Sequence, residues 1–174
     1  TLRTKAGIIL DEDEALKARD AYRDTHPGVV ALWKAGGRML ARLAGGPPVQ
    51  WGPTCVRDGK IHLPNGCPLD YSTLEFYRDE EEEYWRLKTR RGWTKMYGAK
   101  LVENLIQALA RVVISQAMVR IVGLGYRIVS TEHDSLWILI PKDGREKWHV
   151  DRCLVEMSRT PSWLPGIPLA AECN

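Results

Sequence analysis

The segment 100–122 constrains the fold of this chain more than any other part of the sequence. Its apolar residues recur at the three- and four-residue spacing of an α-helix, and Gly123 and Gly125 follow it. The apolar positions are Leu101, Val102, Leu105, Leu109, Val112, Val113, Ala117, Met118 and Ile121. The pattern predicts one long helix with a wide apolar stripe, ended by the glycines.

Two short apolar runs, 126–130 and 136–140, come directly after the predicted helix. Glu132, His133 and Asp134 form a polar break between them, and Pro141 ends the second run. This arrangement predicts a β-hairpin with an acidic residue at its tip. We therefore expect an α+β fold, in which a small antiparallel sheet that includes this hairpin packs against the long helix.

Helices are also predicted near the two ends of the chain. The segment 11–25 has strong helix formers and starts with acidic residues, and a second helix follows His26 and Pro27 up to the Gly-Gly-Pro-Pro run at 45–48. Gly36 and Gly37 weaken the middle of this second helix. A last helix is predicted over 145–157, followed by an irregular tail over 161–168.

Between the helices, the segment 49–74 has the signals of β-structure. The dipeptides at 58–59 (Asp-Gly) and 65–66 (Asn-Gly) predict tight hairpin turns. The acidic run 79–83 is interpreted as a solvated loop or the start of a helix. Trp85, Leu87 and Trp93 indicate that the following segment packs against the body of the protein.

Composition restricts the class of protein. The chain has 174 residues, is 44% hydrophobic and has a net charge of +3, which suits one globular domain and allows only a local basic surface. Candidates for that surface are Lys88, Arg90, Arg91, Lys95 and Lys100.

No run approaches the roughly 18 uninterrupted apolar residues of a membrane span, so no membrane partner is expected. The four cysteines have no zinc-site spacing, and we expect them to be reduced.

Four polar residues of the long helix, Lys100, Asn104, Gln107 and Arg111, fall on one stripe that faces away from the apolar one. One interpretation is an ordinary solvated helix face. The other is a contact with duplex DNA, because amides can bond the minor-groove acceptors that all base pairs share. In that case Lys100 and Arg111 would take phosphates.

Asp134 also has two interpretations. An Asp in a tight turn is common because its side chain bonds nearby backbone. A carboxylate at a rigid, exposed tip is also a suitable ligand for a divalent ion in phosphoryl transfer, which uses two ions about 4 Å apart held by carboxylates from separate segments. Mg²⁺ fits this role because it accepts one or two carboxylates together with phosphate oxygens.

Several segments resemble the phage branch of the family A DNA polymerases. The segment 97–111 is similar to the helix that precedes the catalytic hairpin, and His133 and Asp134 match the start of the motif His-Asp-Glu. Weaker similarities lie at 22–27, 32–33, 63–66 and 163–171, in the order of the family. The resemblance covers nearly the whole chain.

The resemblance implies a role for each candidate residue. Asp134 would be a ligand of two catalytic Mg²⁺ ions, and His133 would lie near the primer terminus. Gln107, together with Asn104 or Glu103, would face the minor groove of the primer-template duplex. Residues 1–46 would be helices from the base of the fingers, and residues 47–174 the palm with its catalytic hairpin.

The resemblance also implies partners and a location. The substrates would be primer-template DNA and deoxynucleoside triphosphates, in the cytoplasm of a phage-infected bacterial cell. The N-terminus lacks an initiator Met, so we expect a piece of a longer protein. The missing segments, including the first metal-binding motif and the nucleotide-binding helix, would come from an upstream polymerase segment on the same polypeptide or a separate subunit. The isolated chain would then be inactive.

The sequence departs from the family pattern at two positions. Ser135 replaces the Glu that usually follows the catalytic Asp, and Val112 occupies a helix position that often holds Asp. Asp70 begins a segment that resembles the other catalytic motif, but it lies on the wrong side of the fingers in chain order, so we do not expect it to bind metal.

Three functional hypotheses stay open at this stage. The first is the C-terminal palm part of a template-directed DNA polymerase. The second is a non-catalytic module that holds primer-template duplex, which the replacement at Ser135 favours. The third is a protein-interaction domain that uses its tryptophan-rich surface to dock a partner.

Overall fold

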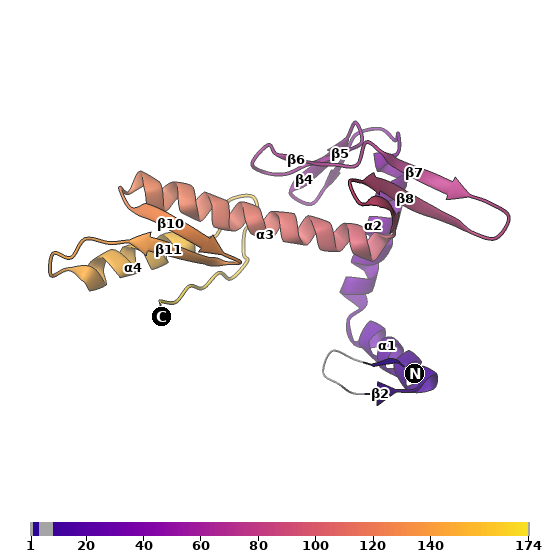
Figure 1. Ribbon diagram of the computed structural model, residues 1–174, viewed down its shortest axis with the longest axis horizontal. Helices are drawn as coiled ribbons and strands as arrows, with labels where there is room; N and C mark the ends of the chain where they lie inside the picture. Colours follow the sequence, from indigo (N-terminus) through magenta and orange to yellow (C-terminus); the bar gives the residue numbers. More distant parts are fainter. Residues whose placement is uncertain (1, 4–8, 174) are drawn as a thin grey trace.

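The computed structural model describes residues 2–3 and 9–173, and over these residues the protein has an α+β fold, as predicted. Figure 1 shows the longest helix lying along the long axis of the molecule, with β-structure and a second helix at each end. The described helices are α1 (Glu12–Thr25), α2 (Pro27–Leu43), α3 (Gly98–Gly123) and α4 (Glu146–Met157).

The described strands form four separate antiparallel sheets. The first pairs β1 (Leu2–Arg3) with β2 (Ile9–Leu10). The second is a meander of β3 (Val49–Trp51), β4 (Thr54–Arg57), β5 (Lys60–His62) and β6 (Pro68–Asp70). The third contains β7 (Leu74–Arg78), β8 (Glu83–Thr89) and β9 (Gly92–Met96), and the fourth is the hairpin of β10 (Arg127–Glu132) and β11 (Ser135–Leu139).

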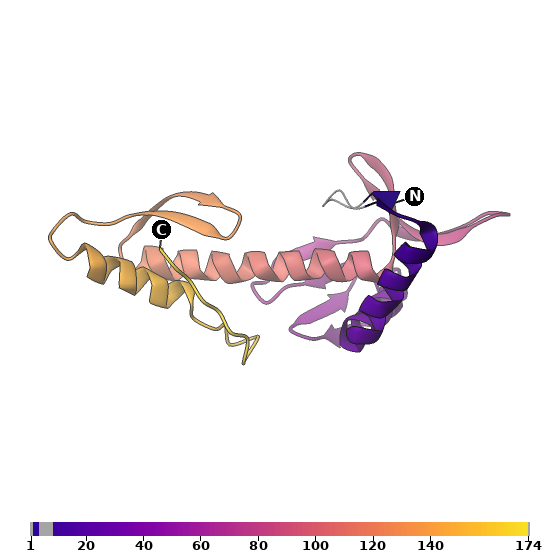
Figure 2. The ribbon, with the colours of Figure 1, turned by 90° about the horizontal axis from the view of Figure 1, so that it is seen from below.

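The hairpin packs near the end of α3, as predicted, but it does not join a larger sheet. We expected one small sheet that included the hairpin. The two meander sheets precede α3 in the chain and lie near its start, whereas the hairpin follows it (Figures 1 and 2). Because α3 has 26 residues and is about 39 Å long, it can contact both groups of strands along its length.

The predicted turns are present, and one sheet was not predicted. Asp58 and Gly59 join β4 to β5 with φ values of 52° and 69°, as a two-residue turn requires. Residues 79–83 contain a turn and the first residue of β8, not the start of a helix, because the Asp79 carboxylate accepts the backbone N–H groups of Glu81 and Glu82. The sheet over 74–96 was missed, although its segments are rich in aromatic residues.

The predicted helices are all present, and α2 passes through its two central glycines without a break. Gly36 is buried, and a Cβ atom added there would lie 2.5 Å from the carbonyl oxygen of Gly98 in α3. A Cβ atom added at Gly98 would in turn overlap the carbonyl oxygen of Trp33. The glycines therefore allow the backbones of α2 and α3 to touch, a role that helix propensity alone does not reveal.

Two apolar cores lie along α3. The first is formed by α2, the two meander sheets and the first half of α3, and its buried members are Leu40, Leu43, Val56, Ile61, Leu63, Tyr71, Leu74, Met96, Leu101, Leu105 and Val112. The second joins the end of α3 to the hairpin and α4, with Ile121, Tyr126 and Cys153 buried. Val112 is therefore a core residue, in agreement with its place in the apolar stripe.

By length and composition, α3 is also the one helix in the described part of the chain that could cross a membrane. The core helix of a globular protein passes the same test. Leu101, Leu105 and Val112 of α3 are buried in the first core and Ile121 in the second. These positions give α3 one face that packs into both cores.

The contact between α2 and α3 gives a prediction with an internal control. Gly36→Ala should lower the free energy of unfolding by about 1–3 kcal/mol, because the new methyl group must push the two backbones apart. Gly37→Ala should be neutral or raise stability by up to about 1 kcal/mol, because the space beside Gly37 is open and alanine favours helix. Urea unfolding followed by circular dichroism measures both. Equal effects of the two variants would show that this contact is not tight.

Candidate functional site

The tip of the β10–β11 hairpin is a two-residue turn made of His133 and Asp134, and both side chains are exposed. His133 has a φ of 51°, in the left-handed region that residues other than glycine seldom adopt. Glu132 and Ser135 are paired directly across the last rung of the ladder. Within the described residues, the carboxylate of Asp134 makes no hydrogen bond or ion pair, so it is available to a ligand from outside this chain.

Arg111 links the hairpin tip to the polar stripe of α3. Its Nη1 atom donates a hydrogen bond to the backbone carbonyl of His133 over 3.4 Å. The structure therefore brings together two features that lie far apart in the sequence, the acid at the tip and the last residue of the predicted stripe.

The other three residues of the stripe have different surroundings. Lys100 is half-buried, and Gln107 is exposed and donates from Nε2 to Oε1 of Glu103 over 3.4 Å. Asn104 donates from Nδ2 to the phenol oxygen of Tyr71 over 3.0 Å. Burial raises the pKa of Tyr71, and the bond from Asn104 opposes this shift. The amide of Asn104 is therefore held in one orientation, with its oxygen and one N–H still unused.

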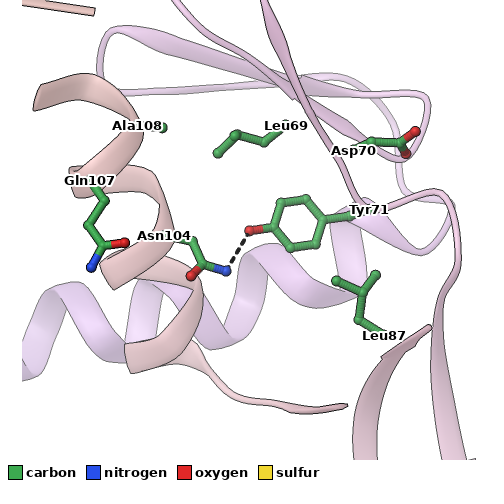
Figure 3. A pocket seen from close by; sticks show the side chains of 7 residues that line it. All are labelled: Leu69, Asp70, Tyr71, Leu87, Asn104, Gln107 and Ala108. Carbon is green, nitrogen blue, oxygen red and sulfur yellow. Dashed lines mark hydrogen bonds between the residues drawn. The ribbon is translucent and has the colours of Figure 1, made fainter. Parts of the chain in front are cut away.

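A shallow depression of about 470 Å³ lies beside Asn104 and Gln107. Figure 3 shows Asn104 pointing toward Tyr71, with Gln107 on the side away from it. The remaining lining residues are Leu69, Asp70, Leu87 and Ala108. The depression is open, so the amides at its edge are accessible to a large partner.

Asp70 also lies at this depression, but its carboxylate points away from α3 (Figure 3). It accepts a hydrogen bond from the backbone N–H of Ser72 over 2.8 Å, and hydrogen bonds from Ser72 lower the pKa of Asp70. These contacts are those of an acid that stabilises a local turn.

Acidic ligands are few at the candidate site. In the part of the chain that the structure describes, no group of three His, Cys, Asp or Glu side chains gathers in a way that could hold a metal ion. Asp134 supplies one free carboxylate, and Glu132 lies at the adjacent end of the strand pair. Mg²⁺ can use one or two protein carboxylates when phosphate oxygens complete its shell. The tip thus fits part of a magnesium site.

A second depression, at the base of the hairpin, is lined in part by Tyr126 and His149, which belong to a polar network that sequence reasoning missed. The phenol oxygen of Tyr126 lies 2.8 Å from Nδ1 of the buried His149, and Nε2 of His149 lies 3.3 Å from Oδ2 of Asp143. Hydrogen bonds from Arg145 and then from His149 lower the pKa of Asp143 to about 2. This network joins the hairpin, the following loop and α4.

The irregular tail is attached to α3 as well. Trp163 donates from Nε1 to Oε1 of Gln116 over 3.0 Å, and Arg120 pairs with Glu156 of α4 over 2.9 Å. Cys55, Cys67 and Cys153 form no disulfide within the described residues.

The chain resembles a phage DNA polymerase. It is 28% identical over 176 residues to a protein from Bacillus phage SP02 named DNA polymerase, in an alignment that covers 94% of this chain. The same alignment covers 27% of that protein, so this chain spans about a quarter of the length of the curated relative that it matches. No protein-family model and no solved structure matches the chain.

The Asp143 network gives a prediction about pH. Asp143→Asn should destabilise the protein at pH 7, because the neutral amide loses the ion pair of the carboxylate with Arg145 and its hydrogen bond with His149. The pKa of Asp143 is lowered from 3.8 to about 2. The stabilisation is therefore complete above about pH 4 and disappears as the pH falls through 2.

Urea unfolding of the two proteins at several pH values between 2 and 7 measures this difference. Asp151→Asn is the matched control, since Asp151 is an exposed acid of the adjacent helix α4. A stability difference that stays constant down to pH 2 would contradict the assignment.

Proposed function

We propose that this chain is the C-terminal palm part of a template-directed DNA polymerase of family A, with helices from the base of the fingers in residues 1–46 and the palm in residues 47–174. Residue 1, residues 4–8 and residue 174 of these regions lie outside the described residues. The observation that carries the proposal is the free carboxylate of Asp134 at a hairpin tip bonded to the amide-bearing stripe of α3. The similarity to a phage DNA polymerase supports it.

The reaction would be attack of a primer 3′-hydroxyl on a deoxynucleoside triphosphate, with release of pyrophosphate. Bound Mg²⁺ would lower the pKa of the 3′-hydroxyl and stabilise the charge that develops on the phosphate. Asp134 would hold the two ions of the complete enzyme together with a carboxylate from the upstream polymerase segment. His133, beside it in the turn, would contact the primer terminus.

The polar stripe of α3 would hold the duplex product. Gln107 is exposed and Asn104 keeps one N–H unused, so both can donate to the acceptors that every base pair presents in the minor groove. Lys100 and Arg111, at the two ends of the stripe, would take phosphates. Contacts of this kind do not depend on base sequence, as an enzyme that copies any template requires.

Ser135 favours a second candidate function, a module that holds primer-template duplex without chemistry. The replacement of the usual Glu removes one carboxylate from the tip. Glu132 lies opposite Ser135 in the strand pairing, so its carboxylate is placed to replace the one that is missing at Ser135. The two functions share the stripe on α3 and differ in whether Asp134 is required.

Primer extension separates these candidates. The chain joined to the upstream polymerase segment should extend a recessed primer with Mg²⁺, and the chain alone should not. Asp134→Asn should reduce extension by roughly a thousandfold, because a metal ligand contributes several kcal/mol to the transition state. Asp58→Asn, which changes the Asp of a two-residue turn elsewhere in the molecule, is the control and should leave extension intact.

Full extension by the Asp134→Asn protein would exclude the catalytic role of Asp134. Loss of extension with Glu132→Gln would mean that Glu132 replaces the acid missing at Ser135. If the joined protein binds duplex but does not extend it, the non-catalytic module is the better description.

Duplex binding tests the stripe on α3 independently of chemistry. Gln107→Leu should weaken binding of the chain to a labelled duplex by about 1 kcal/mol, or roughly fivefold, for any base sequence. Lys100→Gln should lower the salt dependence of binding by about one phosphate contact, a slope change near 0.9. Val119→Gln, which changes a side chain that is 73% exposed elsewhere on α3, is the control. An effect that varies with duplex sequence would contradict minor-groove contact of this kind.

A further inference from the structure

The sheet β7–β9 has two different faces. Trp85 and Leu87 pack on one face against the first core. Because strand residues alternate, their neighbours point to the other face, where the strand pairing places aromatic and charged side chains together. This outer face contains Glu75, Tyr77, Tyr84, Arg86, Lys88, Trp93 and Lys95.

Cations and rings are interleaved on the outer face. The guanidinium of Arg86 lies 4.1 Å from the ring centre of Tyr77 and 4.2 Å from that of Trp93. Lys95 lies 4.3 Å from the ring centre of Tyr84. These contacts hold the rings in place, and Trp93 is still 47% exposed.

The charges of this sheet are separated along its length. The β7–β8 turn contains the acidic run 79–83 and projects away from α3 (Figure 1). The β8–β9 turn lies at the opposite end of the sheet, because successive turns of a meander alternate, and it contains Arg90 and Arg91 beside Lys88.

Ion pairs neutralise three cations of the sheet and leave three others unpaired. Arg78 pairs with Glu83, Arg86 with Glu75 and Lys95 with Glu82. Among the described residues no acidic group pairs with Lys88, Arg90 or Arg91, all of which are exposed. Together with Trp93 these three residues form what we call the basic end of the sheet.

We propose that the basic end binds single-stranded DNA. Phosphates match its unpaired cations, and an unpaired base can stack on Trp93, whereas a duplex covers the faces of its bases. The acidic run at the other end of the sheet repels the same strand and limits the site to the β8–β9 turn. The choice of DNA as the polyanion rests on the proposed function, whereas the existence of the basic surface does not depend on that proposal.

The position of the basic end assigns it a separate task from the stripe on α3. Leu87, on the inner face of β8, lines the depression beside Asn104, whereas Lys88 and Trp93 lie on the outer face. The two surfaces therefore face different directions. A chain that holds duplex on α3 would hold the unpaired template strand on the basic end.

Fluorescence anisotropy with a labelled oligothymidylate and the full 174-residue chain tests this inference. The double variant Arg90→Gln/Arg91→Gln should weaken binding and reduce the salt slope by about 1.4, or 0.7 for each lost phosphate contact. Trp93→Leu should weaken binding about tenfold, and Trp93→Phe should restore most of the loss, because a base stacks on any aromatic ring. Arg78→Gln, at the acidic end, is the matched control and should change nothing.

Several outcomes would overturn the inference. Unchanged oligothymidylate binding by the double variant would overturn it. Both arginines lie in an exposed turn, so the variant should still fold and the comparison is valid. Equal competition by polyglutamate of the same charge would make the basic end a docking site for an acidic protein segment. Duplex binding that still depends on Gln107 while oligothymidylate binding ignores Arg90 and Arg91 would leave the proposed function standing without this site.

Discussion

The fold depends on one continuous helix that belongs to two apolar cores. Leu101 and Leu105 bury the start of α3 against α2 and the meander sheets, and Ile121 buries its end against the hairpin and α4. Since a helix of this length is stiff on the scale of side-chain contacts, the distance between the two cores is set by α3 itself. The close approach of Gly36 and Gly98 places α2 across the start of this helix, so the N-terminal half of the molecule is positioned from the same element.

The orientation of the hairpin is decided by apolar packing more than by its polar contacts. The bond of 3.4 Å from Arg111 to the His133 carbonyl is exposed, and a hydrogen bond of this kind contributes at most about 0.5–1.5 kcal/mol. Full burial of a side chain of this size contributes about 1.5–3 kcal/mol, and Ile128, Leu136 and Ile138 of the hairpin are all partly buried against the second core, so their sum is the larger effect. Arg111 therefore aligns a tip whose position the second core has already determined.

Much of the fold was predictable from sequence because its signals are local. Helix periodicity, the acidic start of α1 and the Asp-Gly turn at 58–59 depend on residues close in the chain, and all are present in the structure. The separation of the strands into four sheets was not predictable, since strand pairing beyond a hairpin depends on tertiary contacts. Gly36 and Gly37 show the same limit: propensity marks them as weak points, but only the neighbouring helix explains why Gly36 is suited to its place.

The candidate site also has features that the sequence predicts and features that only the structure shows. Asp134 and the stripe on α3 could be identified from sequence because each forms a pattern in one segment. The contacts of Asn104 with Tyr71, 33 residues away, and of Tyr126 with His149 join segments that no periodicity relates. The two residues of the hairpin turn can be judged only when the sequence and the backbone conformation are considered together. At Asp58 the left-handed position holds an Asp followed by Gly, a favoured turn pair, whereas at the hairpin tip this position holds His133 with Asp134 after it. Asp and His are both over-represented at left-handed positions, so this turn can form without glycine, and both side chains stay exposed at the tip.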